Sequence, residues 1–540
     1  MASVAAAGAL AALVSALAPA AASGTSPLPA TSPAASPAAR AEDPLRPYAQ
    51  QKPRWQPCDA GSPAALRCAT LHVPLDYGDP GGRTIDIAIS RQKAGSAKDR
   101  RGVLLLNPGG PGGSGLNMPA DPDLPLPEEV RSHFDLIGFD PRGVGRSSPV
   151  SCGLTEEEQV VARPYRASSF AKDVEWARTV ADKCRAAAGG TLPHLTTRDT
   201  ARDMDVIRAV LGEERISYLG YSYGTYLGAV YTQLFPHRAD RFVLDSATDP
   251  GRVWRGMFEQ MAEAAEPAFT RWSEWSAARD ATYHLGRSPA EVRAAFWDLV
   301  ARADRTPLDA GDGPRSGDDL RSERDRFFHV REAAVWVAGL KKAAGGAHPA
   351  RPETPAAPGT PGAPGEPAAA ATPGRAATPG RTANPAGPSI APAVPQDNDA
   401  ASGWAVMCAD TPLWPRDPES YRRDTIRAKA RYPLYGDFAS GIKPCAFWQR
   451  GSEPATTVNN TVGALILQNE WDPLTPLPGG QAMHRALRGS RMITVAGGEG
   501  HGVYTLGNSC ADRAATAYLV TGRLPARDLT CRAADETERK

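Results

Sequence analysis

The sequence has no surplus of charge of either sign. Its 61 Lys and Arg residues balance 60 Asp and Glu residues, which leaves a formal net charge of +1. Binding to nucleic acid or to an anionic membrane needs a concentrated field of positive charge. We therefore expect a protein that binds no nucleic acid and forms no stable association with a membrane.

The sequence also lacks the common motifs for metal ions and nucleotides. No two cysteines have the C-x-x-C spacing of metal sites, and neither an H-E-x-x-H motif nor a P-loop is present. A G-x-G-x-x-G pattern does occur at 110–115, as in dinucleotide-binding folds. There, however, Pro111 removes a backbone donor, and the proline-rich stretch after Gly115 cannot open a helix. We expect neither a metal ion nor a cofactor.

Beyond its first residues the sequence has no apolar run long enough to span a membrane. Residues 4–17 are apolar, and the small residues after them fit an A-x-A cleavage pattern, although no Lys or Arg precedes the run. The run is too short and too rich in alanine to span a bilayer well. We interpret 1–22 as a signal peptide and predict a secreted, extracellular protein.

Eight cysteines, an even number, agree with export into an oxidising compartment. Spacing alone does not choose among the possible pairings, and buried free thiols are the alternative. We favour pairs between sequence neighbours, which close short loops: Cys58–Cys68, Cys152–Cys184, Cys408–Cys445 and Cys510–Cys531.

Two stretches are rich in proline and small residues. One is 23–44, and the other is about 343–400, where ATPGR occurs twice. With almost no large apolar side chains, neither stretch can offset the entropy lost on ordering. We predict that both are disordered and that the second is a flexible insertion.

Short apolar runs alternate with helical patterns over 45–250 and again over 441–540. Buried strands that alternate with helices are typical of an α/β fold with a doubly wound, mostly parallel sheet. Residues 251–440 interrupt this alternation with a helical, Trp- and Ala-rich pattern, so we predict a helical lid inserted into the sheet domain. The expected strands lie within 84–94, 102–108, 134–140, 216–222, 241–247, 463–469 and 491–497.

One serine stands at a predicted turn from strand to helix. Ser222 lies between Gly220 and Gly224 in the sequence GYSYG, and no other serine fits the G-x-S-x-G pattern. A tight turn of this kind lifts the serine hydroxyl out of the backbone, and the glycines let strand and helix approach. A packing turn is the alternative, but the strand–turn–helix context favours a nucleophile.

A serine nucleophile needs a base, and the base needs an acid to orient it. In this architecture the order along the chain is Ser, then Asp or Glu, then His, each after a strand. Asp472 and His501 meet this requirement. Glu470 and Glu499 are rivals for the acid, whereas His484 lies within a helical pattern and is a weaker candidate for the base.

Acyl transfer also needs backbone N–H groups that stabilise an oxyanion. Tyr223 follows the nucleophile and is expected to supply one donor. The glycine-rich loop LLLNPGGPGGSG at 104–115 follows an early strand, and we choose Gly110 in it as the second donor.

Five motifs together resemble the secreted tripeptidyl aminopeptidases of actinomycetes, which are related to proline iminopeptidases. They are NPGGPGGSG, FDPRGVGRS, GYSYGTYLG, LQNEWDPLTP and GEGHG, in this order. Pro108 replaces the histidine that begins the oxyanion loop of the iminopeptidases. The resemblance implies an α/β-hydrolase fold with an inserted helical lid, and a role for five residues: Ser222 as nucleophile, Asp472 as acid, His501 as base, and Gly110 and Tyr223 as oxyanion donors.

This resemblance implies a secreted serine exopeptidase that releases short peptides, expected to be tripeptides, from free N-termini. Its partners would be peptide substrates, and we expect a monomer. A carboxylesterase on the same scaffold is the first alternative, since the triad would be identical. A non-catalytic surface protein that kept the fold is the second, against which the complete triad argues.

An exopeptidase must bind a free ammonium group, and a buried charge needs a partner of opposite sign. We predict that Asp410, two residues after Cys408, provides this carboxylate, although it could instead cap a helix. Trp471 would line the pocket beside the catalytic acid. Arg142 and Arg146 are expected to tie loops together rather than to contact substrate.

Overall fold

The apolar runs of the sequence pair with one another in one sheet of ten strands. All pairs between β1 and β5 are antiparallel, and all pairs from β5 to β12 are parallel, which confirms the predicted α/β fold. In their order across the sheet, the strands are β1 (Gln56–Pro57), β2 (Leu66–Pro74), β3 (Thr84–Gln92), β5 (Phe134–Phe139), β4 (Gly102–Asn107), β6 (Ile216–Tyr221), β7 (Ala239–Asp245), β10 (Ala464–Trp471), β11 (Arg491–Glu499) and β12 (Leu529–Arg532).

All these strands belong to one compact unit, Pro44–Lys540. The predicted signal peptide 1–22 lies outside the described residues, as do nearly all of 23–44 and most of the predicted insertion. The computed structural model describes residues 43–59, 61–161, 163–309, 313–345 and 393–533. No helix within these ranges is long and apolar enough to cross a bilayer.

The strand order places a topological switch point at the centre of the sheet. β4 lies between β5, which follows it in the chain, and β6, which comes later. The connections that follow β4 and β6 therefore lead toward opposite edges of the sheet. Open α/β sheets bind ligands at such a switch point, at the carboxyl ends of the strands. The glycine-rich loop after β4 and the Ser222 turn after β6 meet at this point.

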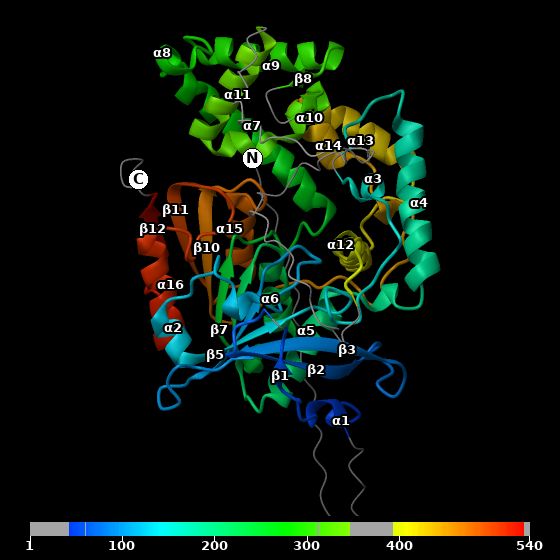
Figure 1. Ribbon diagram of the computed structural model, residues 1–540, viewed down its shortest axis with the longest axis vertical. Helices are drawn as coiled ribbons and strands as arrows, with labels where there is room; N and C mark the ends of the chain where they lie inside the picture. The colour runs from blue at the N-terminus through cyan, green and yellow to red at the C-terminus, as the bar shows by residue number, and fades with distance from the viewer. Residues whose placement is uncertain (1–42, 60, 162, 310–312, 346–392, 534–540) are drawn as a thin grey trace, which may run out of the picture. The chain divides into compact units, whose positions relative to one another are not determined.

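Both faces of the sheet are buried, because neighbouring side chains of the central strands enter two different hydrophobic clusters. Leu105 packs in one cluster, and Leu104 and Leu106 pack in the other. Figure 1 shows α2 and α16 side by side against one face. On the first cluster lie α4 (Phe170–Ala188), α5 (Thr197–Val210), α6 (Tyr223–Leu234) and α15 (Leu477–Ala486), and on the second lie α2 (Glu128–His133) and α16 (Ser509–Thr521).

Helices between β7 and β10 carry a hydrophobic cluster of their own. Phe269, Phe296 and Phe327 lie with ring centroids 4.7 to 5.3 Å apart at its centre. Figure 1 shows α7, α9 and α11 grouped together away from β2 and β3. We call this group the cap: α7 (Arg255–Ala277), α8 (Asp280–Tyr283), α9 (Pro289–Arg305), the strand pair β8 (Leu308–Asp309) and β9 (Pro314–Arg315), α10 (Gly317–Ser322), η4 (Arg324–Phe328) and α11 (Val330–Ala344).

The last helices of the predicted lid behave differently from the cap. α12 (Asn398–Ala409) buries Ala401, Trp404 and Ala405 in the first of the two clusters on the sheet, together with residues of α5 and α6. It is followed by α13 (Pro418–Arg431) and α14 (Gly436–Ser440). α12 is therefore a part of the sheet domain's core, although it lies within the lid segment of the sequence.

Four disulfides join sequence neighbours, as expected from the sequence. They link Cys58 to Cys68, Cys152 to Cys184, Cys408 to Cys445, and Cys510 to Cys531. The Cys408–Cys445 bond ties the end of α12 to the segment before β10, and the last bond ties α16 to β12.

Candidate active site

Ser222 occupies the turn between β6 and α6 in a strained backbone conformation. Its φ is 55° and its ψ is −123°, a region that non-glycine residues seldom adopt. The N–H of Ser222 donates to the carbonyl oxygen of Asp245 (3.0 Å), and the carbonyl of Ser222 accepts from both the N–H and the hydroxyl of Thr225. These bonds hold the turn, and they set Ser222 at the carboxyl end of β6.

One glycine on each side of Ser222 allows this turn to be tight. A Cβ on Gly220 would lie 2.7 Å from the carbonyl oxygen of Gly224, and one on Gly224 would lie 2.7 Å from Asn107 Oδ1. Strand and helix backbones are therefore too close for any side chain at these positions, as the G-x-S-x-G pattern predicts.

The glycine-rich loop after β4 packs directly on the Ser222 turn. A Cβ on Gly109 would lie 2.5 Å from the carbonyl oxygen of Tyr221 and 2.9 Å from Ser222 Cβ. The N–H of Gly109 donates to Asn107 Oδ1 (3.1 Å), so Gly110 carries the next N–H along the loop. Tyr223 is the first residue of α6, where a backbone N–H has no acceptor inside the helix. The loop after β4 and the start of α6 therefore both lie at the Ser222 turn, and the roles of the Gly110 and Tyr223 N–H groups as oxyanion donors stay predictions.

Asp472 and His501 form a hydrogen-bonded pair. His501 Nδ1 lies 3.0 Å from both carboxylate oxygens of Asp472, which is 1% exposed. The same carboxylate accepts from the N–H groups of Leu474 and Thr475 at 2.9 Å, and from the Thr475 hydroxyl at 3.0 Å. These donors fix the carboxylate, which in turn fixes the orientation of the imidazole.

Asp245, which sequence reasoning missed, joins the loop of His501 to the turn of Ser222. Its carboxylate accepts from the N–H groups of Val503 (3.0 Å) and Tyr504 (2.7 Å), while its carbonyl accepts from Ser222. The N–H of Gly502 donates to the hydroxyl of the next residue, Ser246 (2.8 Å). Burial raises the pKa of Asp245 to about 7, against the opposing effect of these hydrogen bonds.

The pKa of His501 is raised above its ordinary value. Burial by itself would lower it, but the charge and hydrogen bond of Asp472 outweigh that effect, and Asp245 and Asp325 act in the same direction. The negative charges of Asp472, Asp245 and Asp325 thus favour the protonated form of the His501 imidazole.

The rival acids and base have other partners. Glu470 accepts from the N–H of Gly497 (2.6 Å), and Glu499 pairs with Arg271 of the cap (2.5 Å). His484 lies 2.7 Å from Ser490 Oγ and 3.1 Å from Asp528. None of these side chains takes the place of Asp472 or His501 in the pair described above.

Asp410 does not have the position predicted for an amine-binding residue. It is 7% exposed, and its two oxygens accept from the N–H and the hydroxyl of Thr197 and from Trp254 Nε1. Burial raises its pKa to about 6, opposed by those hydrogen bonds. Because protein donors occupy the carboxylate on both oxygens, it has no place for a substrate ammonium group. The prediction is wrong because the donors come from parts of the chain that the local sequence does not reveal.

Trp471 lies at the junction of the sheet domain and the cap. Its ring packs against the cap cluster, with the guanidinium of Arg271 4.6 Å from its centroid. Its carbonyl accepts from the N–H of Gly500, next to His501 (3.0 Å). A role in lining a substrate pocket stays a prediction.

Both arginines of the DPRGVGRS loop tie segments together. Arg142 is 1% exposed and pairs with the buried Asp203 at 2.6 Å, while also donating to the carbonyls of Leu75 and His194. Arg146 pairs with Asp59 at 2.6 Å. These contacts agree with the structural role expected from the sequence.

A second residue that sequence reasoning missed is Asp325, which the cap places beside the pair. Its carboxylate interacts electrostatically with both Asp472 and His501, and it lies 2.6 Å from Arg324 Nη1. Arg324 also donates to the carbonyl oxygen of Pro473 (2.8 Å), which anchors this part of the cap beside the acid. The Asp325 side chain is 50% exposed, although its Oδ1, the oxygen next to Arg324, is buried. Desolvation there raises its pKa.

Comparison with known proteins places this arrangement in a family. A tripeptidyl aminopeptidase of Streptomyces lividans is 35% identical over 505 residues, which cover 88% of this chain and 86% of that protein. The chain belongs to the tripeptidyl aminopeptidase family of α/β-hydrolases. Residues 102–328 match the family model described as alpha/beta hydrolase fold, and 432–531 match the one described as TAP-like protein. The protein is therefore a serine hydrolase of this family.

Less similar relatives include a serine protease and a carboxylesterase. Serine protease Hip1 of Mycobacterium tuberculosis is 30% identical over 502 residues, covering 90% of this chain and 92% of that protein. Carboxylesterase B of the same organism is 30% identical over 516 residues, covering 91% and 92%. Among solved structures, a proline iminopeptidase of Mycobacterium smegmatis is 14% identical, with a TM-score of 0.33 and coverage of 80% of this chain and 91% of that one.

Replacement of the candidate nucleophile is the first test of this site. We expect Ser222→Ala to reduce kcat by a factor on the order of 10⁶, because a triad without its nucleophile loses the whole covalent route. Purified protein should keep its far-ultraviolet circular dichroism and melting temperature. A folded variant with more than about a hundredth of the original rate would contradict the assignment.

The pH dependence tests His501 as the base. Only neutral imidazole can accept the serine proton, and the raised pKa of His501 means that protonation begins at a higher pH than for an ordinary histidine. We expect kcat/KM to fall on acidification with a midpoint above about 6.5. Phosphonylation of the serine by a fluorophosphonate should follow the same midpoint, and a midpoint below the ordinary histidine value would contradict the role.

Proposed function

We propose that the protein is a secreted serine exopeptidase that releases short peptides, tripeptides in particular, from free N-termini. The observation that carries the proposal is the buried Asp472 carboxylate, bonded to His501 in a loop that Asp245 joins to the strained Ser222 turn. The printed names of two relatives, a tripeptidyl aminopeptidase and a serine protease, support peptides as the substrate.

Each residue takes a defined part in the proposed reaction. Ser222 Oγ attacks the scissile carbonyl carbon while its proton passes to His501 Nε2, and Asp472 holds the opposite ring nitrogen. The carbonyl oxygen becomes an oxyanion that accepts from the N–H groups of Tyr223 and Gly110. His501 then gives its proton to the leaving amine, which departs as the shortened peptide. Water, deprotonated by His501, hydrolyses the remaining acyl ester and restores the serine.

Secretion is supported by two features of different kinds. The N-terminal sequence fits a signal peptide, and every cysteine among the described residues is paired in a disulfide. Such bonds form and persist in oxidising compartments outside the cytosol. Purification of the mature protein from culture medium, followed by determination of its N-terminal residue, would test the cleavage site.

In this proposal Asp325 of the cap receives the substrate ammonium group, in place of Asp410. Its side chain is half exposed, and its charge interacts with those of Asp472 and His501. Desolvation and the charge of Asp472 raise its pKa although Arg324 lies 2.6 Å away, and the positive charge of an ammonium group would oppose both effects. A tripeptide spans roughly 10 Å when extended, so its ammonium group has to be held by a residue set back from the serine.

Substrates with and without a free amine separate the peptidase from the esterase alternative. We expect tripeptidyl aminomethylcoumarins to show a higher kcat/KM than dipeptidyl or aminoacyl ones. N-acetylation should lower that value about tenfold or more, since a charge-assisted bond is lost. Equal cleavage of acetylated and free peptides would exclude the exopeptidase. Hydrolysis of p-nitrophenyl esters alone would favour a carboxylesterase, the printed name of one relative.

Replacement of Asp325 tests the proposed amine site. We expect Asp325→Asn to raise KM for free-amine tripeptides tenfold or more, since the lost bond contributes roughly 1.5–3 kcal/mol. Hydrolysis of a small neutral ester should barely change. Because Asp325 also raises the pKa of His501, the rates are compared on the alkaline plateau of each variant's pH profile, where His501 is neutral.

A matched control for this change is Asp298→Asn, which alters an exposed carboxylate on α9 of the cap. It should leave both substrates unaffected. Equal losses on peptide and ester in Asp325→Asn would mean that Asp325 acts on the triad or on the cap's structure rather than on the amine.

A further inference from the structure

A chain of hydrogen bonds runs from Asp410 to the residue that follows the nucleophile. Asp410 Oδ2 lies 2.6 Å from the hydroxyl oxygen of Thr197, and that oxygen lies 3.0 Å from the hydroxyl of Tyr223. Asp410 Oδ1 accepts from the N–H of Thr197 at 2.7 Å, and Trp254 Nε1 donates to Oδ2 at 3.0 Å. All four residues are buried.

The direction of each bond in this chain follows from the number of protons. A carboxylate can only accept, so the single hydroxyl proton of Thr197 is donated to Asp410. The Thr197 oxygen must then accept from Tyr223, whose hydroxyl is the donor. Asp410 therefore determines the polarity of the whole chain up to the side chain of Tyr223.

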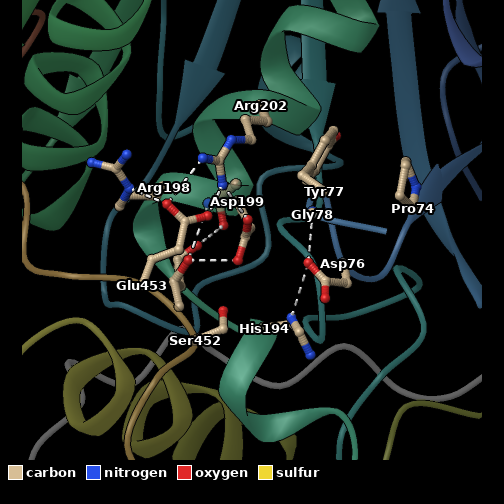
Figure 2. Close-up of polar contacts among 12 residues, drawn as sticks. Pro74, Asp76, Tyr77, Gly78, His194, Arg198, Asp199, Arg202, Ser452 and Glu453 are labelled. Carbon is tan, nitrogen blue, oxygen red and sulfur yellow. Dashed lines mark hydrogen bonds and ion pairs between the residues drawn. The ribbon is translucent and has the colours of Figure 1, made fainter. Parts of the chain in front are cut away.

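The two segments that carry Thr197 and Asp410 are each held in place by further bonds. Figure 2 shows Glu453 between Arg198 and Arg202, which fixes the first turns of α5 beside Thr197. Arg202 also pairs with Asp199 at 2.6 Å. Asp410 itself follows α12, which the Cys408–Cys445 bond ties to the core.

Tyr223 connects this anchored network to the reacting atoms. Its side chain is 2% exposed, and its ring lies 5.5 Å from that of Trp254, centroid to centroid. Its backbone N–H, on the same residue, is the oxyanion donor of the proposed mechanism. Because the side chain and this N–H belong to one residue at the start of α6, holding the side chain in place also restrains the N–H.

We propose that Asp410 is a positioning residue for catalysis, which acts through Thr197 to hold the N–H of Tyr223 in place for the oxyanion. This inference rests on the proposed function, because it takes Ser222 as nucleophile and Tyr223 as donor. Asp410 does not contact substrate, so its effect falls on the transition state and not on substrate binding.

The Asp410→Asn variant keeps the shape of the side chain but puts a donor where one carboxylate oxygen accepts. An amide nitrogen at the Oδ2 position leaves both the Thr197 hydroxyl and Trp254 Nε1 without their acceptor, and one at the Oδ1 position leaves the Thr197 N–H without its acceptor. Loss of a whole oxyanion donor costs about 10²–10³ in kcat, and a displaced donor costs less. We expect kcat to fall about 10- to 100-fold on peptides and on small esters alike, with KM changed less than about twofold.

The matched control lies at the other end of the same helix. Asp397 is a buried carboxylate at the start of α12 that accepts from Ser151 Oγ and from the N–H groups of Cys152 and Leu154, at 2.7 to 3.0 Å. Asp397→Asn should lower the melting temperature and leave kcat unchanged. An equal loss of kcat in both variants would show that Asp410 only stabilises α12, and would overturn the proposal.

Two further variants decide the matter if Asp410→Asn does not fold. Tyr223→Phe removes the hydroxyl and keeps the backbone N–H, and it should lower kcat about tenfold with an unchanged KM, whereas Thr197→Ser keeps the hydroxyl and should retain most of kcat. Where Asp410→Asn folds, its effect should not add to that of Tyr223→Phe, since both break one chain. Unchanged kcat in Tyr223→Phe, or a rise in KM alone, would overturn the proposal.

A transition-state analogue provides a readout that fold stability does not move. A tripeptidyl boronic acid forms a tetrahedral adduct on the serine, so its inhibition constant should weaken by the same factor as kcat in Asp410→Asn. Unchanged inhibition would overturn the positioning role. If Ser222→Ala kept its activity, the proposed function itself would fail. This result differs from those that overturn only the positioning role of Asp410.

Discussion

The backbone of Ser222 is held at a positive φ, and the rest of the site is arranged around that constraint. A non-glycine residue in such a conformation costs on the order of 1–3 kcal/mol, which the surrounding structure has to offset. Here the offset comes from bonds on both sides of the turn: Asp245 accepts the N–H of Ser222, and Thr225 donates to its carbonyl. Gly109, in the loop after β4, packs against the same turn with no room for a side chain. The strained residue is therefore enclosed by three segments that come from different strands.

Buried carboxylates then connect the turn to the rest of the site, each by a different route. Asp472 orients the imidazole of His501, and Asp245 holds the following residues of the same loop. Asp410 bonds to Thr197, whose hydroxyl is bonded to Tyr223 on the opposite side of the turn. Buried acids are costly unless their oxygens find donors, and all three find them in backbone N–H groups together with side chains.

A feature of the fold or of the candidate site can be predicted from the sequence when the residues that determine it lie close together in the chain. The Ser222 turn, the strand ends at Asp472 and His501, and the neighbouring cysteine pairs all have local signals, and the sequence predicts where they lie. β2 is not among the predicted strands, since exposed residues interrupt its apolar pattern. For Asp410 the signal is not local. Its partner Thr197 lies 213 positions away in the sequence, so no local pattern could reveal that its carboxylate is already hydrogen-bonded.

The catalytic residues and the substrate specificity of the enzyme depend on different parts of the structure. A peptidase and an esterase can share every residue around Ser222, because the attack on an ester and on an amide needs the same nucleophile, base and oxyanion donors. What differs is the surface that meets the remainder of the substrate, and in the proposed function that surface includes the cap. Its links to the sheet domain, from Arg324 to Pro473 and from Arg271 to Glu499, lie at the two strand ends that carry the acid and the base. A cap fastened at these points presents Asp325 to the site from a fixed position. Recognition of a free amine can therefore depend on a cap residue without any change in the groups that perform the chemistry.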